Sequence, residues 1–313
     1  MHRRGFLQAS LSTGLFFGGA ASFTPVQAQE TIVGKENSGK LLRPLGLQLS
    51  TVTPLLVNDF EGTLARVAEV GYRQVEFSAL GLLGRPVAKV TELLDAHQLE
   101  APVGRVSPPL PDNFATLNRL EQRQVFMARG GLEHFLDNVR YSLDIALQMG
   151  QKQLVLPALF PDRFQNLDQV KENIDLLNQA GTICAEQGVL FGYHNHDWEL
   201  KALEGKIPYH MMIEQTDASA LSFQLDAYWV TKGGGELKDY LTTFAGRFTS
   251  AHLKDINAQG SFEDVGFGLI NFPAFIRHAK QVGCDYFFVE RDNPPDPFNA
   301  IVRSYGYLET MRF

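Results

Sequence analysis

Four short apolar segments in the C-terminal half of the chain each contain or end in a residue that can bind a metal. These residues are His194, Asp226, His252 and Glu290. Two imidazoles and two carboxylates form a mixed nitrogen and oxygen site, which suits Mn²⁺, Co²⁺, Zn²⁺, Fe²⁺ or Mg²⁺ better than an ion that prefers thiolates. The sequence therefore predicts a site for one divalent metal, provided that the fold brings the four segments together.

The chain alternates short apolar runs with longer amphipathic stretches, which is typical of repeated βα units. We expect eight strands and, between them, several helices that mostly end at glycine. The expected strands cover 45–50, 74–78, 101–106, 153–157, 189–196, 222–226, 249–254 and 286–291, and the expected helices include 60–70, 87–97, 132–149, 167–187, 237–244 and 272–282.

Eight such units in a chain of this length predict an α/β fold, a single-domain (β/α)₈ TIM barrel over residues 41–313. An open doubly wound sheet fits less well because no glycine-rich phosphate turn follows the first strand. In a TIM barrel the active site lies at the carboxyl ends of the strands. Because side chains alternate along a strand, one inward-facing set would bring the four candidate ligands together. The irregular stretch 107–124, with three prolines, is a candidate lid.

Each candidate also has a structural interpretation when taken alone. A histidine at a strand end is often hydrogen-bonded within the core, Asp226 can cap the segment after it, and Glu290 can belong to a solvated charge cluster with Arg291 and Asp292. Four metal-competent residues at the ends of four successive strands are unlikely as a coincidence. The joint pattern therefore favours the metal site.

Several blocks of sequence resemble the sugar phosphate isomerase/epimerase family of xylose isomerase-like TIM barrels. They are GLQLS at 46–50, GYRQVEF at 71–77, YHNHDWE at 193–199, LDAYW at 225–229, HLKD at 252–255 and VERDN at 289–293. The resemblance implies a metal held by His194, Asp226, His252 and Glu290. Many relatives carry Glu where His194 stands and His where Arg105 stands, so this chain departs from the family pattern at both positions.

The resemblance also implies a reaction. A metal-bound carbonyl compound loses the proton on the neighbouring carbon through an enediolate, with Glu290 as the candidate base and Lys254 or His196 as candidate proton donors. Isomerase or epimerase action on a sugar or keto-sugar is expected first. β-Elimination from a keto-sugar, keto-glycoside or keto-inositol, and metal-dependent sugar binding without catalysis, are the alternatives.

Five further residues are expected to contact the carbohydrate or to support the site. Arg105 is a candidate for an anionic group, and Trp229 for stacking on a sugar ring. Glu199 and His196 are candidates for orienting the ligands. Glu76 is a candidate for substrate hydroxyls, with pairing to an arginine as the alternative. The set of expected substrate-binding residues is Glu76, Arg105, Glu199, Trp229 and Asp255.

The N-terminal 28 residues have the features of an export signal. Arg3 and Arg4 precede an apolar, glycine-containing stretch and a small-residue cleavage site at 26–28, and the start resembles a twin-arginine signal. An ordinary secretory signal or an uncleaved anchor is the alternative. We expect recognition by the twin-arginine export machinery, a periplasmic location, no stable membrane anchor, and a flexible leader over 29–40.

Charge and cysteine content narrow the function classes. The formal net charge is −7, and it becomes −9 without the predicted signal, which contains two arginines and no acid. This balance argues against nucleic-acid binding and against a phosphodiesterase of the endonuclease IV type, which would also need more histidine ligands. Two cysteines, Cys184 and Cys284, cannot form a disulfide framework, and we expect buried free thiols. A homo-oligomer is compatible with the sequence.

Overall fold

The computed structural model describes residues 39–313. The predicted signal segment and most of the predicted leader lie outside the described residues. At the end of the predicted leader, the Lys40 backbone N–H donates to Phe313 O and the Lys40 carbonyl accepts from the Phe313 N–H. A bridge between Leu41 and Arg312 continues this pairing. The N-terminal edge of the folded domain is therefore tied to its C-terminal end.

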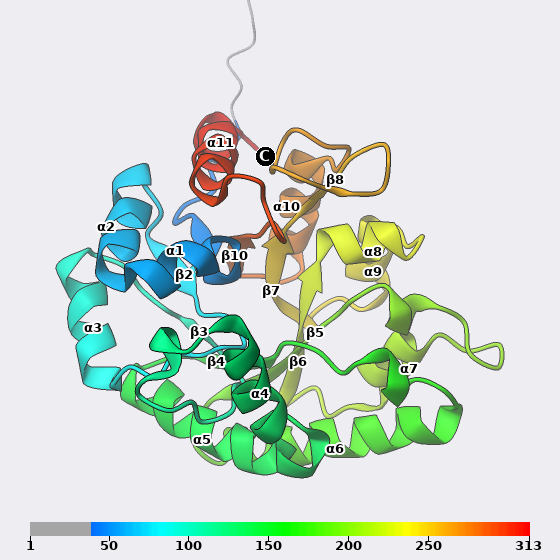
Figure 1. Cartoon of the computed structure of the whole chain (residues 1–313). Coiled ribbons are helices and arrows are strands. Elements are labelled where there is room, and N and C mark those ends of the chain that lie inside the picture. Colours follow the sequence, from blue (N-terminus) through cyan, green and yellow to red (C-terminus); the bar gives the residue numbers. More distant parts are fainter. Residues whose placement is uncertain (1–38) are drawn as a thin grey trace, which may run out of the picture. The chain divides into compact units, whose positions relative to one another are not determined.

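Eight parallel strands form the predicted barrel, surrounded by helices (Figure 1). They pair in the order β2-β1-β10-β7-β6-β5-β4-β3. The two end strands of this order, β2 and β3, are joined only through a bridge between Gln74 in β2 and Glu100, which precedes β3, so the barrel is nearly closed. The barrel strands are β1 (Gly46–Gln48), β2 (Gln74–Glu76), β3 (Val103–Arg105), β4 (Gln153–Leu156), β5 (Leu190–His194), β6 (Leu221–Asp226), β7 (Phe248–Leu253) and β10 (Tyr286–Val289).

All six helices named from the sequence are present, and five were missed. The helices are α1 (Thr53–Asn58), α2 (Phe60–Val70), α3 (Val87–Ala96), α4 (Arg119–Arg129), α5 (Phe135–Gln148), α6 (Leu167–Ala185), α7 (Pro208–Gln215), α8 (Ala227–Lys232), α9 (Leu237–Thr243), α10 (Phe272–Gln281) and α11 (Pro297–Thr310). A small hairpin, β8 (Asp255–Ile256) with β9 (Phe262–Glu263), follows β7. The predicted irregular lid contains the start of α4, so it is not wholly irregular.

Helix α2 shows how local sequence builds one unit. The Asp59 side chain accepts a hydrogen bond from the Gly62 backbone and caps the helix. Phe60, Leu64 and Val67 recur at helical spacing and are buried against the barrel. The helix ends at Gly71, whose φ of +120° favours glycine, and a Cβ there would clash with Tyr305. The next residues then enter β2.

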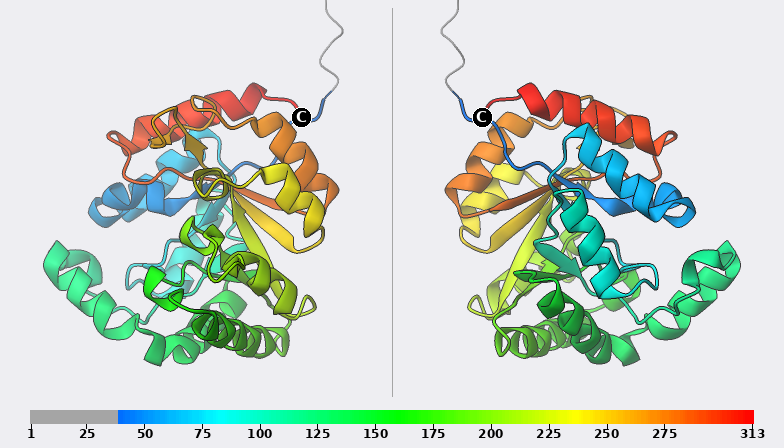
Figure 2. Two further views of the ribbon diagram at one scale, coloured as in Figure 1. Left: turned by 90° about the vertical axis from the view of Figure 1, so that its right-hand side faces the viewer. Right: turned by 90° about the vertical axis from the view of Figure 1, so that its left-hand side faces the viewer.

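The barrel core is continuous and includes residues from every barrel strand except β3, which lies in a small adjoining cluster. Cys184 and Cys284 are both buried and unpaired, as expected. None of the helices in the described part of the chain is long and apolar enough to cross a membrane. Helices α1 and α4 lie at one end of the barrel, and α4 projects from the body there (Figure 2).

Candidate metal centre

The four predicted ligands converge at the carboxyl end of the barrel. His194 and Asp226 end β5 and β6, His252 lies near the end of β7, and Glu290 follows β10. All four are buried, and one ligand atom from each lies within 4.8 Å of the others. Ligands at about 2.0–2.3 Å from one ion can be separated by roughly 4.5 Å. The four side chains are therefore close enough to share a cation.

Asp226 has a buried oxygen atom that a cation could satisfy. Its Oδ1 accepts a hydrogen bond from the Trp229 backbone at 2.9 Å, but its buried Oδ2 has no hydrogen-bond partner. Oδ2 lies 3.7 Å from His194 Nε2 and 3.8 Å from His252 Nδ1. Burial raises the pKa of Asp226 to about 7, although Lys254 opposes the shift. An unpartnered buried carboxylate oxygen is costly, and a metal ion would satisfy it.

Two side chains, Gln224 and Glu76, position His194 through consecutive hydrogen bonds. Its Nδ1 lies 3.0 Å from Gln224 Oε1, while Gln224 Nε2 donates to Glu76 Oε1 at 2.9 Å. Because the amide nitrogen faces the carboxylate, the amide oxygen faces Nδ1, which must carry the proton. The Nε2 lone pair of His194 then points towards Asp226. Burial, together with the His252 and Arg105 charges, lowers the pKa of His194 well below 6.5, which keeps the ring neutral and able to bind metal.

His252 lies between two carboxylates. Its Nε2 is 2.6 Å from Glu76 Oε2, and its Nδ1 is 2.8 Å from Glu290 Oε2. Burial alone would lower the pKa of His252, but Glu290 and Glu76 raise it to about 9. If a metal replaced the Nδ1 proton, Glu76 would still hold the Nε2 proton and fix the ring orientation, as in carboxylate–histidine–metal triads.

Glu76 was expected either to bind substrate hydroxyls or to pair with an arginine, and in the structure it pairs with Arg105. The residue is fully buried, and its oxygens also accept hydrogen bonds from Gln48 at 2.7 Å and Arg105 at 3.3 Å. Burial alone would raise the pKa of Glu76, but Arg105 and His252 lower it. With its acceptors used by the protein, Glu76 orients His252 and Gln224.

Glu290 and Lys254 form the charged edge of the site. Glu290 Oε1 accepts a hydrogen bond from Ser50 Oγ at 2.7 Å, and Oε2 accepts one from Lys254 Nζ at 3.0 Å. Lys254 also lies 2.7 Å from Asp292 Oδ2. Burial opposes both charges, but Lys254 and His252 hold the pKa of Glu290 well below its usual value, and the acids raise the pKa of Lys254. The carboxylate and the ammonium are therefore both charged at neutral pH.

His196 faces the same cavity as His194. Its ring stacks on Trp198 at a centroid distance of 4.2 Å, and its buried Nδ1 has no partner. Burial and the nearby Lys254 charge lower the pKa of His196 to about 3, so the ring is neutral at physiological pH. A neutral imidazole forms hydrogen bonds but is a poor acid for protonating a leaving group. Of the two expected proton donors, Lys254 is therefore the one that carries a positive charge.

Arg105 lines the cavity, as expected. Its Nη2 lies 3.3 Å from Glu76 Oε2 and 3.1 Å from His252 Nε2. The Nε and Nη1 atoms are buried and have no partner. These donors are available to an oxygen atom of a bound molecule, which need not be an anion because Glu76 already partly neutralises the guanidinium.

Besides Glu76, three expected substrate-binding residues do not line the cavity at the barrel mouth, which we call the mouth cavity. The Trp229 ring lies 5.1 Å from the His196 ring between centroids, and Lys254 Nζ lies over the indole at 5.2 Å. Glu199 is fully buried and accepts from the Tyr193 hydroxyl and the His196 backbone, and burial raises its pKa to about 8. Asp255 accepts hydrogen bonds from four backbone amides, those of Ile256, Gly266, Gly268 and Ile270. Glu199 and Asp255 therefore support the backbone around the site, whereas Trp229 contacts His196 and Lys254 and has a buried Nε1 without a hydrogen-bond partner.

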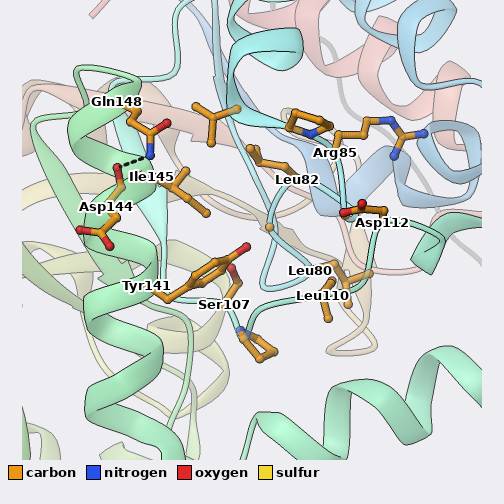
Figure 3. A pocket seen from close by; sticks show the side chains of 15 residues that line it. Leu80, Leu82, Arg85, Ser107, Leu110, Asp112, Tyr141, Asp144, Ile145 and Gln148 are labelled. Carbon is orange, nitrogen blue, oxygen red and sulfur yellow. Dashed lines mark hydrogen bonds between the residues drawn. The ribbon is translucent and has the colours of Figure 1, made fainter.

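The mouth cavity has a volume of about 310 Å³ and is lined by His194, His196, Lys254, Glu290 and Arg105, among others. Sequence reasoning missed Gln48, Ser50, Gln224 and Asp292. Gln224 had one available signal, because it lies two residues before Asp226 and so shares its face of β6. A further cavity of about 440 Å³ lies between loop 80–87 and α5 (Figure 3), and none of the four candidate ligands lines it.

Within residues 39–313, His194, Asp226, His252 and Glu290 form the one group of three or more His, Cys, Asp or Glu side chains able to hold a metal ion. A nuclease that uses a multi-metal cluster would need further ligands beside this group.

Comparison with known proteins gives the same fold. The chain is similar to a sugar phosphate isomerase/epimerase from Parabacteroides distasonis, with 23% identity, a TM-score of 0.68, and coverage of 88% of this chain and 95% of that one. It also resembles the 3-keto-D-glucoside 4-epimerase from E. coli, with 17% identity, a TM-score of 0.61, and coverage of 87% and 100%.

A third similar structure is the probable 3-DHS dehydratase from Bacillus anthracis, with 11% identity, a TM-score of 0.61, and coverage of 86% and 99%. No curated protein matches the chain in sequence. The family model described as xylose isomerase-like TIM barrel matches residues 64–311, which is most of the chain. The chain belongs to the xylose isomerase-like TIM barrel family.

Proposed function

We propose that this protein is a sugar isomerase or epimerase that uses one divalent metal and removes a proton from the carbon next to a carbonyl. The observation that carries the proposal is the unpartnered Asp226 Oδ2, which faces the nitrogens of His194 and His252 at the end of the barrel. Family members similar in fold include epimerases and isomerases of sugars, which supports a carbohydrate substrate.

The metal would be held by His194, Asp226, His252 and Glu290. When bound, a divalent ion supplies Lewis acidity, which stabilises negative charge on a carbonyl oxygen after the neighbouring carbon loses its proton. The buried carboxylates and neutral imidazole suit Mn²⁺, Co²⁺, Zn²⁺, Fe²⁺ or Mg²⁺.

The chain supplies a base and a proton donor next to each other. Glu290 is ionised, and the Ser50 hydroxyl fixes one of its oxygens. Lys254 keeps its proton in the resting site and lies within hydrogen-bond distance of Glu290 and Asp292. Arg105 presents two unpaired donor nitrogens to substrate oxygens. Proton removal by Glu290 and proton return by Lys254 follow from this arrangement.

One feature favours β-elimination as a second candidate. An epimerase that works from both faces of a carbon needs a base on each face, whereas β5 here ends in His194, a neutral ligand whose Nδ1 is already bound to Gln224. Glu290 and Lys254 lie together on one side, 3.0 Å apart. Removal of the proton and protonation of a leaving oxygen from this side would make the protein a dehydratase or lyase for a keto-sugar, keto-glycoside or keto-inositol.

Proton exchange in D₂O tests the proposal. Protein loaded separately with each candidate metal is incubated with methyl 3-keto-glucoside and related keto-sugars, and the reaction is followed by ¹H NMR. We expect deuterium at the carbon next to the carbonyl of the recovered keto-sugar, together with a rearranged sugar for an isomerase or epimerase, or an unsaturated keto-sugar that has lost this hydrogen for a lyase. Sugar binding without exchange would identify a non-catalytic binding protein.

Glu290→Gln is expected to abolish exchange, and the metal content of the variant must be measured because Glu290 is also a candidate ligand. The matched control is Glu92→Gln, which changes an exposed carboxylate on α3. Wild-type exchange in Glu290→Gln would remove Glu290 from the mechanism.

We also propose that the twin-arginine machinery exports the folded protein to the periplasm, since Arg3 and Arg4 precede the apolar stretch in the N-terminal segment. Replacement of both arginines by lysine is expected to leave the full-length protein in the cytoplasm. Continued export of that variant would favour an ordinary secretory route.

A further inference from the structure

A second, larger cavity adjoins the mouth cavity above the first strand. It has a volume of about 640 Å³, and Ser50 and Thr53 line both cavities. On its far side it is bordered by Leu117, Asn118 and Arg119, from the predicted lid segment and the start of α4. We call this second cavity the outer cleft. Its inner border is close to the chemistry, because Ser50 Oγ lies 2.7 Å from Glu290 Oε1.

The two volumes suit a substrate with two parts. At roughly 30 Å³ for each water-sized group, 310 Å³ corresponds to about ten such groups, or one sugar unit of hexose size. The outer cleft has about twice that volume. A free monosaccharide at the metal ligands would therefore leave the outer cleft unused, whereas a glycoside would extend across Ser50 and Thr53 into it.

The lining of the outer cleft matches a neutral polyhydroxylated group. It combines hydroxyls and amides, such as those of Thr53, Asn58 and Gln122, with apolar faces from Pro54 and Leu117. Arg119 is the only charged residue in the lining. Sugar rings present hydroxyls at their edges and C–H groups on their faces, so they can use both kinds of surface.

The helix ends beside the outer cleft are poorly suited to a phosphate group. At the start of α4, the Asn118 side chain accepts hydrogen bonds from the Leu120 and Glu121 amides, and Glu121 accepts one from the Asn118 backbone. At the start of α11, Asp296 accepts from the Asn299 amide. Free backbone N–H groups bind anions at helix N-termini, but here these N–H groups already donate to side chains of the protein, and the Glu121 and Asp296 carboxylates add negative charge.

We propose that the natural substrate is a glycoside or disaccharide, with a keto-sugar unit at the metal ligands and a second neutral sugar or similar polyol in the outer cleft. This inference rests on the proposed function for the reacting unit. The second unit determines specificity, and the outer cleft has no role in the proton transfer itself.

Binding of unreactive sugars separates this inference from catalysis. Isothermal titration calorimetry is carried out on the full-length metal-loaded protein with methyl glucoside, glucose 6-phosphate, and the disaccharides maltose, cellobiose, trehalose and sucrose. We expect at least one disaccharide to bind tenfold or more tightly than methyl glucoside and glucose 6-phosphate. If no disaccharide binds more tightly than these two probes, the inference is overturned.

A variant pair locates the binding energy. Asn58→Trp places a large side chain at an exposed position that lines the outer cleft but not the mouth cavity. The control, Glu61→Trp, introduces the same side chain at an exposed position on α2 that lines neither cavity. Asn58→Trp is expected to raise the Kd of the preferred disaccharide at least tenfold and leave that of methyl glucoside unchanged. Glu61→Trp is expected to change neither value.

Kinetics distinguish failure of the inference from failure of the proposed function. Turnover of methyl 3-keto-glucoside without a lower KM for any 3-keto-disaccharide would overturn the two-unit substrate and leave the proposed reaction intact. Tight disaccharide binding that Asn58→Trp removes, in a protein without turnover, would support the outer cleft and contradict the proposed reaction. Equal effects of Asn58→Trp and Glu61→Trp would overturn the assignment of the outer cleft.

Discussion

Replacing Glu76 by glutamine tests how the site prepares His194 for metal binding. In the wild-type protein, Gln224 donates to Glu76 and so turns its oxygen towards His194 Nδ1. Three donors, among them His252 Nε2, bind Glu76 Oε2 in the wild-type protein. In the variant the amide oxygen takes the place of Oε2 and accepts from these donors, and the amide nitrogen takes the place of Oε1. This nitrogen then faces the nitrogen of Gln224, and two donors cannot bind each other. Rotation of the Gln224 amide relieves this conflict.

Rotation of the Gln224 amide is expected to weaken metal binding by His194. The rotated amide presents its nitrogen to His194 Nδ1, which must then accept, so the ring proton moves to Nε2 and removes the lone pair that faces Asp226. Loss of an orienting contact of this kind lowers metal affinity about 10- to 100-fold, or roughly 1.4–2.7 kcal/mol. We expect a loss in this range for Glu76→Gln, measured by isothermal titration calorimetry with Mn²⁺, Co²⁺ and Zn²⁺.

A compensating change makes the test specific. In the double variant Glu76→Gln/Gln224→Glu, the new amide at position 76 can donate to the new carboxylate at position 224, whose other oxygen accepts the His194 Nδ1 proton. The double variant should therefore bind metal more tightly than Glu76→Gln alone. Circular dichroism and thermal melting check that both variants fold. Unchanged affinity in the single variant, or a double variant no better than the single, would refute the relay from Glu76 through Gln224 to His194.

Three further predictions follow from the same geometry. Lys254→Met should lower the rate of product formation by about 10²- to 10⁴-fold because it removes the proton donor, while deuterium exchange at the acidic carbon persists. Equal loss of product formation and of deuterium exchange would contradict the assigned role. His252 is protonated below its pKa of about 9, and a metal requires its Nδ1 lone pair. Metal affinity should therefore rise up to about tenfold per pH unit until pH 9 and then level off, and calorimetry in different buffers should detect the released proton. An affinity independent of pH would contradict this. Asp255→Asn should lower the free energy of unfolding, measured in urea, by about 3 kcal/mol. The reason is that an amide cannot accept from all four backbone N–H groups, so buried donors lose their partner. A stability equal to that of the wild type would show that water or a shift of loop 266–270 replaces those bonds.

The barrel and the positions of the four ligands could be predicted from the sequence because they depend on local patterns. Apolar runs separated by amphipathic stretches indicate parallel strands, and parallel strands of a barrel end on the same side. His194, Asp226, His252 and Glu290 then converge wherever the inward face is correctly assigned. The predicted strands agree with the structure to within a few residues at their ends.

The roles of the supporting residues could not be predicted because they depend on contacts across the barrel. Glu76 reaches His252 from a strand 176 residues away in sequence, and nothing near Glu76 in the chain indicates that partner. Asp255 is different, since a local rule was available. It is adjacent to Lys254, and successive side chains on an extended segment point in opposite directions, so Asp255 turns away from the cavity and binds loop 266–270.

The missed helices have related causes. Helices α1 and α8 contain six residues each, too few for a clear helical period, and such short helices depend on packing against the rest of the protein. Helix α4 has no buried residue, so the apolar pattern that predicts helices is weak there. Its capping box at Asn118 and Glu121 was the available signal.

The most direct test of the account is the location of a bound metal. Crystals of the protein grown with Mn²⁺ or Co²⁺ are measured at the absorption edge of the metal, and an anomalous difference map gives the position of the ion. We expect one ion per chain at about 2.0–2.3 Å from His194 Nε2, Asp226 Oδ2, His252 Nδ1 and a Glu290 oxygen. A map without an ion among these four side chains, from protein that binds metal in solution, would contradict it.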